Sequence, residues 1–479
     1  MSKEKMNKGI TLIALIITII VMMILVAVSV TVALNGGLFG TAKDAASKTQ
    51  IEAEKEMLLS AVVGAIGTDA RVDFSKVQLP DGFTGENGVY ESSNGNRFAV
   101  SENGEINQVT FIYKDNIEGL GTGVTLVPYV ELTGELKAAA DLGKISAVIK
   151  ETKDGVEMQA VIPAGFDVSI KNGENTISGG LVVSDANENE FVWVPCTTDV
   201  NGTSGLIIYK QDTQYNTGAL KEIQGTYTNY TGWTDDGGNS KSVSKYKGFY
   251  VGRYEAGIPS NAPFYANVDG EKYLIKEKNT TDYIPVSKPK QPTWNWISQS
   301  NAKIVSEKMY SDSVSVQSSL IDSYAWDTIV NWMESENSGI AIDSTNFGNY
   351  LNSTISLNDI IYAVHKYSFT KWTVVSYSTK YQKGKLEVID RITTGEQPVY
   401  ELETGAMDNS KVLNIYDMAG NMWEWTTEVR DDGNKICAVR RGGSFAVTST
   451  GYPVSGRSGN TDVLYPWISE SFRVVLYIK

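Results

Sequence analysis

The hydrophobic positions near the start of the chain form one long uncharged run. Residues 10–34 carry no charged side chain, and Lys3, Lys5 and Lys8 precede them. At ~1.5 Å per residue, a helix of about 25 residues crosses a hydrocarbon layer of ~30 Å. Lysines before such a helix keep the N-terminus in the cytoplasm. The pattern predicts a single transmembrane helix that anchors the following residues outside the membrane.

Beyond this run the pattern becomes that of a helix and then of short strands. Charged positions from residue 42 give way to apolar ones up to residue 66, which predicts an amphipathic helix, so residues 10–66 are predicted to form a transmembrane and stalk helix. Residues 67–113 contain short strand-like runs around Asn94-Gly95 and Asn103-Gly104, pairs typical of type I′ hairpin turns. They predict a small antiparallel β domain.

Residues 114–155 are predicted to be a linker with little secondary structure, apart from a helical piece at 136–142. The rest, residues 156–479, predicts a larger domain of short strands, long polar loops and helices over 298–310, 323–335 and 357–364. Near its end Phe472, Val474 and Leu476 alternate with other residues, as in a strand with one buried face. The predicted fold class of the chain is α+β.

Three motifs in the last part of the chain carry a family resemblance. Residues 416–425 (YDMAGNMWEW) predict a turn, residues 441–445 (RGGSF) place two glycines where the backbone passes close to a neighbour, and residues 471–479 (SFRVVLYIK) contain the alternating strand. The set resembles the formylglycine-generating enzyme (sulfatase-modifying factor) family, whose domain is a variant of the C-type lectin fold. Residues 191–195 and 248–255 resemble the family's opening strands. The resemblance therefore covers residues 156–479 and implies that fold.

The resemblance does not extend to the family's chemistry. The family's enzyme holds copper with two cysteines that follow RGGS, and this chain has Val447 and Tyr452 at the matching positions. Neither side chain ligates copper or forms a mixed disulfide. The single histidine, His365, excludes sites built from two or more imidazoles, and its apolar surroundings favour a packed side chain. We predict that the protein is not an enzyme and has no catalytic residue or catalytic cofactor.

A structural calcium ion is implied by the same resemblance. The family's turn binds calcium through two side chains and intervening carbonyls, and the matching residues here are Asp417, Gly420, Met422 and Glu424. The alternative is that Asp417 and Glu424 only cap the turn.

Charge and cysteine content narrow the function classes further. The chain has 42 Lys+Arg against 56 Asp+Glu, a net charge of -14 that opposes a phosphate backbone, so nucleic acid is excluded as a partner. Cys196 and Cys437 lie in strand-like runs and are interpreted as buried apolar side chains. A disulfide between them is the alternative.

The first residues resemble a second family. Lys8-Gly9-Ile10 before the apolar run resembles the class III leader of type IV pilins, which prepilin peptidase cuts after the glycine. The resemblance implies a leader at residues 1–9, with Gly9 and Ile10 as the processing residues and pilin subunits as partners. Pilins have glutamate where this chain has Ala14, so processing and anchoring are implied, whereas standard polymerisation is not. A plain signal anchor is the alternative.

The segment between RGGSF and the last strand mixes Tyr and Trp with Ser, Thr, Asn and Gly, as recognition loops do. It also resembles the segment that diversity-generating retroelements vary in bacterial proteins of this fold. We predict that it binds ligand and that replacing Thr448, Arg457 and Tyr465 together abolishes binding while leaving thermal unfolding nearly unchanged. The competing interpretation is that its aromatic side chains fill the core. The predicted ligand-binding residues are Ala446, Val447, Thr448, Thr450, Tyr452, Val454, Gly456, Arg457, Asn460, Thr461, Asp462, Leu464, Tyr465, Trp467 and Ile468.

Together these features predict a pilin-like adhesin on the bacterial cell surface. A single N-terminal helix or a pilus would hold it, and its tip domain would bind an unknown protein or glycan. The alternatives are a minor structural pilin and an enzyme of unknown reaction. The large domain favours binding over a purely structural role, because a filament subunit needs far fewer residues.

Overall fold

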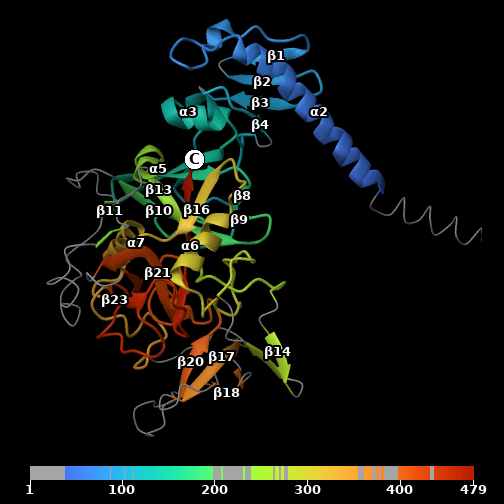
Figure 1. The fold of residues 1–479 in the computed structure, drawn as a ribbon. Coiled ribbons are helices and arrows are strands. Elements are labelled where there is room, and N and C mark those ends of the chain that lie inside the picture. Colours follow the sequence, from blue (N-terminus) through green and yellow to red (C-terminus); the bar gives the residue numbers. More distant parts are fainter. Residues whose placement is uncertain are drawn as a thin grey trace, which may run out of the picture. The chain divides into compact units, whose positions relative to one another are not determined.

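The computed structural model describes much of the chain after residue 37. The described residues are 38–86, 88–101, 103–109, 112–197, 207–208, 230–231, 239–262, 265–268, 271–274, 279–353, 361–368, 374–376, 379–381, 398–431 and 436–479. They belong to two compact units, Met1–Thr110 and Phe111–Lys479, here called the N-terminal and C-terminal units (Figure 1). Among the described residues, no helix is both long and apolar enough to cross a membrane. The predicted leader with Gly9 and Ile10, and the apolar run at 10–34, lie outside the described residues.

The N-terminal unit is a long helix packed on a small antiparallel sheet (Figure 1). Leu58 and Val62 of the helix contact the sheet residues Tyr90 and Phe98, and all four are buried. The helix predicted over 42–66 and the short antiparallel strands predicted within 67–113 are confirmed. The elements are α2 (Leu38–Val63), η1 (Phe74–Lys76), β1 (Phe83–Glu86), β2 (Val89–Ser92), β3 (Arg97–Val100) and β4 (Ile106–Val109).

The turn between β2 and β3 is not of the predicted type. A type I′ turn needs positive φ at both central residues, whereas here Gly95 has φ +80° and Asn94 does not have a positive φ. Gly95 N–H donates to the Ser92 carbonyl, and Ser92 N–H donates to the Asn96 carbonyl. The connection is therefore one residue longer than a two-residue hairpin, with glycine in the left-handed conformation that closes it.

A buried carboxylate ties α2 to this turn. Glu54 is 2% exposed and accepts hydrogen bonds from Ser92 Oγ (3.0 Å), Asn94 Nδ2 (2.6 Å) and Asn96 Nδ2 (2.8 Å). Burial alone would raise the pKa of Glu54, but these donors and Gln50 outweigh it, so its pKa lies below the ordinary value. The ionised Glu54 thus fixes the helix over the β2–β3 turn.

We expect Glu54→Ala to cost the N-terminal unit about 1–3 kcal/mol at neutral pH, because its amide donors lose a charged acceptor. In the wild type this contribution is present above the unfolded pKa of ~4.3 and is lost as the pH falls through the lower folded pKa. Hydrogen exchange of the α2 and β3 amides measures both effects. Glu54→Gln is the control, since it removes the titration, and an unchanged acid response in that variant would contradict the assignment.

The C-terminal unit is built around a seven-stranded, mainly antiparallel sheet with both faces covered. On one face Trp193, Tyr250 and Leu476 pack with a second, three-stranded sheet and helix α6 (Gln299–Lys308). On the other, Phe249 and Val475 pack with helix α7 (Ser323–Glu336). The order of the central sheet is β16 (Val316–Leu320), β25 (Val474–Ile478), β13 (Gly248–Gly252), β10 (Glu190–Thr197), β9 (Val182–Asp185) and β8 (Phe166–Val168), with β11 (Ile207–Ile208) parallel to β10.

The motifs at residues 416–425, 441–445 and 471–479 each contribute residues to a five-stranded sheet or lie at its ends. Its strands are β12 (Tyr230–Thr231), β21 (Trp423–Asp431), β22 (Ile436–Arg441) and β23 (Arg457–Asp462), with β24 (Glu470–Phe472) parallel to β21. The chain then passes from β24 directly into β25 of the central sheet, and Arg473 is the residue between them. The two sheets are therefore joined at a single buried residue.

The remaining elements cap or extend these sheets. Ser298 Oγ accepts from Asn301 N–H at the start of α6, and Asp322 accepts from Ala325 N–H at the start of α7, which satisfies N–H groups that have no partner within the helix. The remaining elements are β5 (Val124–Leu126), η2 (Tyr129–Glu131), α3 (Gly134–Asp141), β6 (Ile145–Lys153), β7 (Val156–Pro163), α5 (Asn239–Tyr246), β14 (Tyr265–Val268), β15 (Glu271–Leu274), α6 (Gln299–Lys308), α7 (Ser323–Glu336), β17 (Ile361–Ser368), β18 (Val374–Ser376), β19 (Thr379–Tyr381), β20 (Pro398–Leu402) and η3 (Asp408–Ser410).

Three sequence predictions need correction. Residues 114–155 are not a linker with little secondary structure, because the strands β5 and β6 lie there and Ile145, Val148 and Ile149 are fully buried. The helical piece predicted at 136–142 is confirmed as α3. The helix predicted over 357–364 is wrong, since β17 begins at Ile361. The last strand has two buried faces rather than one, because it lies inside a sheet that is covered on both sides. The antiparallel sheets and separate helices agree with the predicted α+β class, and the helices predicted over 298–310 and 323–335 are confirmed.

Candidate functional site

The start of the predicted binding segment is fixed by two glycines after β22. Gly442 and Gly443 have φ values of +87° and +77°, a conformation that side chains disfavour. A Cβ on Gly443 would lie 2.4 Å from the Tyr452 carbonyl, and one on Gly442 would lie 2.6 Å from the Met418 carbonyl. The motif therefore brings the backbone of two loops into close contact, as its sequence predicts.

A buried cluster of four charged residues lies beneath the segment. Arg441 Nη2 is 2.5 Å from Asp327 Oδ1, and Arg457 bridges Asp327 (Nη2 to Oδ2, 3.2 Å) and Glu428 (Nε to Oε1, 3.1 Å). All four are at most 2% exposed. Burial lowers the pKa of Arg441 and raises that of Glu428, and in each case the opposite charges counteract the change. The cluster is neutral as a whole and joins α7 to β21, β22 and β23.

The expectation that Arg457 lies on an exposed binding surface is wrong. Its guanidinium points into this cluster because β23 pairs with β22 and places Arg457 opposite Arg441. Val454, Gly456 and Ile468 are buried as well. These four predicted residues support the segment from below and do not face solvent.

A second buried cluster surrounds Arg473, between the two sheets. The guanidinium donates from Nε and Nη2 to both carboxylate oxygens of Glu424, and its other bonds go to the Gly252 and Tyr416 carbonyls. Asp417 accepts from Gly405 N–H and Ser410 Oγ, and Glu255 accepts from Asn421 Nδ2 and Met422 N–H. Every carboxylate oxygen of the three acids thus has a donor within the protein.

The acidic groups of this cluster outnumber its basic groups. Burial raises the pKa of Glu255, and the charges of Asp417 and Glu424 raise it further. Burial also raises the pKa of Asp417 and of Glu424, while Arg473 counteracts both shifts. Three buried carboxyls share one guanidinium, so the Arg473 charge decides how many of them ionise.

The predicted calcium ligands do not fit a calcium ion in this arrangement. Glu424 is bound on both oxygens by Arg473, and both oxygens of Asp417 accept hydrogen bonds. Calcium prefers six to eight oxygen ligands around it. Across the described ranges, no three His, Cys, Asp or Glu side chains are grouped so that they could hold a metal. Gly420 shapes the turn, since it has φ +74° and its N–H donates to the Gly442 carbonyl, and Met422 N–H donates to Glu255 Oε1.

The loop after the glycines is held by polar contacts with α7 and with the segment that follows it. Trp326 Nε1 donates to the Val454 carbonyl (2.9 Å), and Val454 N–H donates to Ser344 Oγ (2.8 Å). Ser449 N–H donates to Asn352 Oδ1 (2.9 Å). Because these contacts hold the backbone on both sides of residues 450–452, the side chains there are presented by a fixed loop.

The predicted ligand-binding residues that face solvent form what we call the exposed face. Tyr452 is 36% exposed, Tyr465 53% and Trp467 44%. Tyr465 and Trp467 are in ring contact, with centroids 5.8 Å apart, and Tyr452 packs edge-on against Trp423 at 5.1 Å. The exposed face comprises Thr448, Thr450, Tyr452, Asp462, Leu464, Tyr465 and Trp467.

A small apolar cluster supports both parts of the exposed face. Met422, Phe445 and Ile468 are buried together, and Ala446 packs against them. In addition, Trp423 N–H donates to the Ser469 carbonyl at 2.8 Å. The loop that carries Tyr452 and the loop that carries Trp467 therefore rest on the same scaffold.

The other predicted residues have intermediate positions. Ala446 and Val447 are half-buried, and Asn460 and Thr461 lie in β23, with side chains outside the described part of the structure. Val447 packs against the core beside α7, so the position where the resemblance places a copper-binding thiol holds an apolar contact. Cys196 and Cys437 are both buried and no disulfide joins them. His365 lies in β17, and its side chain is likewise outside the described part.

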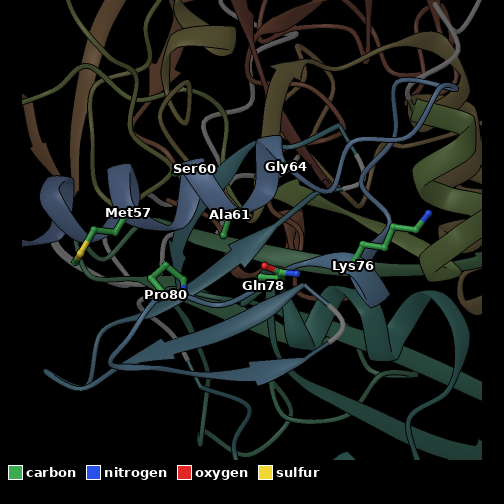
Figure 2. A pocket seen from close by; sticks show the side chains of 7 residues that line it. All are labelled: Met57, Ser60, Ala61, Gly64, Lys76, Gln78 and Pro80. Carbon is green, nitrogen blue, oxygen red and sulfur yellow. The ribbon is translucent and has the colours of Figure 1, made fainter.

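A separate hollow of about 540 Å³ lies on the N-terminal unit (Figure 2). It lies between α2 and the segment that precedes β1, and its polar side chains Ser60, Lys76 and Gln78 are exposed. The hollow shows no buried polar group that would recognise a ligand. It is lined by Met57, Ser60, Ala61, Gly64, Lys76, Gln78 and Pro80.

Comparison with known proteins gives one family match and two structural likenesses. Residues 365–476 match the model of the sulfatase-modifying factor enzyme 1-like domain. No curated protein matches the chain. A crystal structure of CarF is 14% identical, with 49% of this chain and 87% of that one covered and a TM-score of 0.26. Treponema denticola variable protein 1 is 13% identical, with 69% of this chain and 99% of that one covered and a TM-score of 0.19.

Proposed function

We propose that the C-terminal unit is a non-catalytic binding domain that uses the exposed face to hold a ligand outside the cell. The family match at residues 365–476 includes the turn, the glycine motif and the whole exposed face. One fold hosts many activities, so the proposal depends on the site itself. Its ligand is a component of another surface, and we expect a protein, a glycan or a lipid layer.

The observation that carries the proposal is the exposure of Leu464, Tyr465 and Trp467 on a loop with a rigid foundation. These side chains are 68%, 53% and 44% exposed, although each would be more stable when covered. The buried Arg457 precedes them and the buried Ile468 follows them. Aromatic side chains on a preorganised loop bind a partner with little further loss of conformational entropy.

The absence of catalysis is part of the proposal. Val447 and Tyr452 stand where the family resemblance requires thiols, and neither can perform the thiol chemistry. Among the titratable groups near the exposed face, the buried acids and arginines are bound to one another and not directed toward solvent.

We further propose that the chain is anchored as a pilin-like protein on a bacterial surface, with prepilin peptidase cutting between Gly9 and Ile10. A long helix packed on a small antiparallel sheet, as in the N-terminal unit, supports this part. Mass spectrometry of the mature N-terminus tests it, and a chain that retains Met1 would contradict it. Variation at exposed positions such as Thr448 and Thr450 would change the ligand while the buried scaffold stays constant.

The test is binding of the full chain to arrays of glycans and of extracellular proteins. For any glycan or protein on the arrays that the wild type binds, we expect Tyr465→Ser combined with Trp467→Ser to lower the affinity by roughly tenfold or more, since buried aromatic anchors dominate such interfaces. Both side chains are exposed, so unfolding should change by only about 0.5 kcal/mol.

The matched control is Val130→Ser combined with Ile170→Ser, which removes two exposed apolar side chains, 87% and 71% exposed, elsewhere in the same unit. Equal loss of binding in both double variants would show that the effect is not specific to the exposed face. Unchanged binding in the aromatic variant would refute the proposed site.

A further inference from the structure

The exposed face continues into an apolar side chain that lies outside the predicted binding residues. Ile436, at the start of β22, is 52% exposed, and Leu464 of the exposed face is 68% exposed. With Tyr465 and Trp467 they make four large apolar side chains at one end of the five-stranded sheet. We call Ile436, Leu464, Tyr465 and Trp467 the apolar rim.

Strand register places these residues together. Cys437 pairs with Asp462 between β22 and β23, so Ile436 is level with the residue that follows β23. There the chain turns tightly, because Leu464 N–H donates to Asp462 Oδ1 (2.9 Å) and Tyr465 N–H donates to the Asp462 carbonyl (3.0 Å). The turn holds Leu464 and Tyr465 beside the start of β22, and ring contact adds Trp467.

We propose that the apolar rim inserts into the interfacial layer of a zwitterionic lipid bilayer. The inference rests on the proposed function, since it names the partner of the same exposed face. Contiguous exposed apolar side chains mark a protein or membrane contact. Leu464 and Tyr465 stand out from a tight turn, and among the described residues no buried polar group beside them and Trp467 offers the hydrogen bonds that orient a small ligand.

Residue type favours a lipid layer over the other occupants. Tyr and Trp are the side chains enriched at the membrane–water interface, where the ring is covered and its polar atom stays hydrated. Leucine, the most exposed side chain of the rim, is under-represented among protein hot spots, yet it is a usual membrane-facing residue. A glycan would stack on the rings but would gain little from Ile436 and Leu464. The chain's net charge of -14 disfavours an anionic lipid surface.

The test places an environment-sensitive fluorophore on the rim of the full chain. Leu464→Cys is labelled with a thiol-reactive nitrobenzoxadiazole dye, and vesicles of pure phosphatidylcholine are added. Cys196 and Cys437 are fully buried, and burial raises the pKa of the Cys196 thiol, so the introduced cysteine is the one that reacts. Val130→Cys is the matched control, because Val130 is 87% exposed outside the rim.

We expect a blue shift and a gain of intensity at position 464 and neither change at position 130. Because the dye reports its own surroundings, an apolar N-terminal run that binds vesicles does not produce this difference. Replacing Trp467 with Ser in the labelled chain should weaken the vesicle titration about tenfold, since an interfacial anchor is lost.

Equal responses at positions 464 and 130, or no response at 464, would overturn the lipid assignment. A response at 464 to a glycan or protein spot from the arrays, but not to vesicles, would also overturn it while leaving the proposed binding function intact. If the full chain bound nothing on the arrays and the dye at position 464 did not respond to vesicles, both the proposed binding function and the lipid assignment would be refuted.

Discussion

Replacing Arg473 with Met should destabilise the C-terminal unit by about 3–5 kcal/mol, since removal of one partner leaves an uncompensated buried charge. Arg473 and Glu424 are both fully buried and joined through two guanidinium nitrogens. The same guanidinium bonds the Gly252 and Tyr416 carbonyls at the junction of the two sheets. Urea unfolding, followed by tryptophan fluorescence of the full chain, measures the loss.

The loss should depend on pH with a definite sign. Arg473 lowers the pKa values of Glu424, Asp417 and Glu255, which burial raises, so its removal raises these folded-state values further. A carboxyl with a raised folded pKa is accommodated in its protonated form below the unfolded value of ~4.3 and costs stability as the pH rises above it. The variant should therefore be closest to the wild type in acid and furthest from it at neutral pH.

Arg473→Lys is the matched control, because it keeps the charge but loses the two-nitrogen contact with Glu424. It should lie between the wild type and the Met variant and show little of the added pH dependence. If the guanidinium is the structural cation of this turn, adding calcium should not restore the stability of the Met variant. Full recovery of stability with calcium would instead support the calcium ligands predicted from the sequence.

Replacing Arg457 with Met should also cost about 3–5 kcal/mol, because Glu428 would remain buried without its arginine. This reverses the expectation from sequence, which placed Arg457 on the binding surface. The structure instead gives it contacts of 3.1 Å to Glu428 and 3.2 Å to Asp327, at 2% exposure. Ligand binding should fall as well, since β23 leads directly into the exposed face.

A double-mutant cycle separates the charge effect from lost packing. Glu428→Gln removes the acid, and in combination with Arg457→Met it leaves Asp327 with Arg441 as a neutral pair. We expect the double variant to be more stable than the sum of the single losses by about 1–3 kcal/mol. Strict additivity would mean that the two side chains are not coupled.

Local patterns predicted the local parts of the fold. The short strand-like runs around Asn94-Gly95 and Asn103-Gly104 predicted the hairpins, and the patterns over 298–310 and 323–335 predicted α6 and α7. The glycines of RGGSF predicted a close backbone approach, and Gly443 lies against the Tyr452 carbonyl. These features depend on neighbours in sequence, so a reading of the chain can find them.

Features that depend on distant partners could not be read in this way. The sequence around Arg457 is typical of a surface loop, whereas in the structure Arg457 is bound by Asp327 of α7, which lies 130 positions earlier in the chain. Residues 145–149 look like part of a linker until β7 pairs with β6 and the central sheet covers them. Ile436 joins the apolar rim only through the register of β22 with β23. In each case a contact distant in sequence decides the role of the side chain.

The position of β25 also has a consequence for how the protein is made. This strand lies between β16 and β13, which precede it by more than 150 residues, and none of the earlier strands that the structure describes occupies its place. A nascent chain that has emerged only as far as β22 holds two unpaired strand edges and an uncovered core. Such edges invite association with other chains, and non-local pairing is slow. The C-terminal unit therefore has to complete its fold after translation of β25, and until then it depends on being kept apart from other unfolded chains.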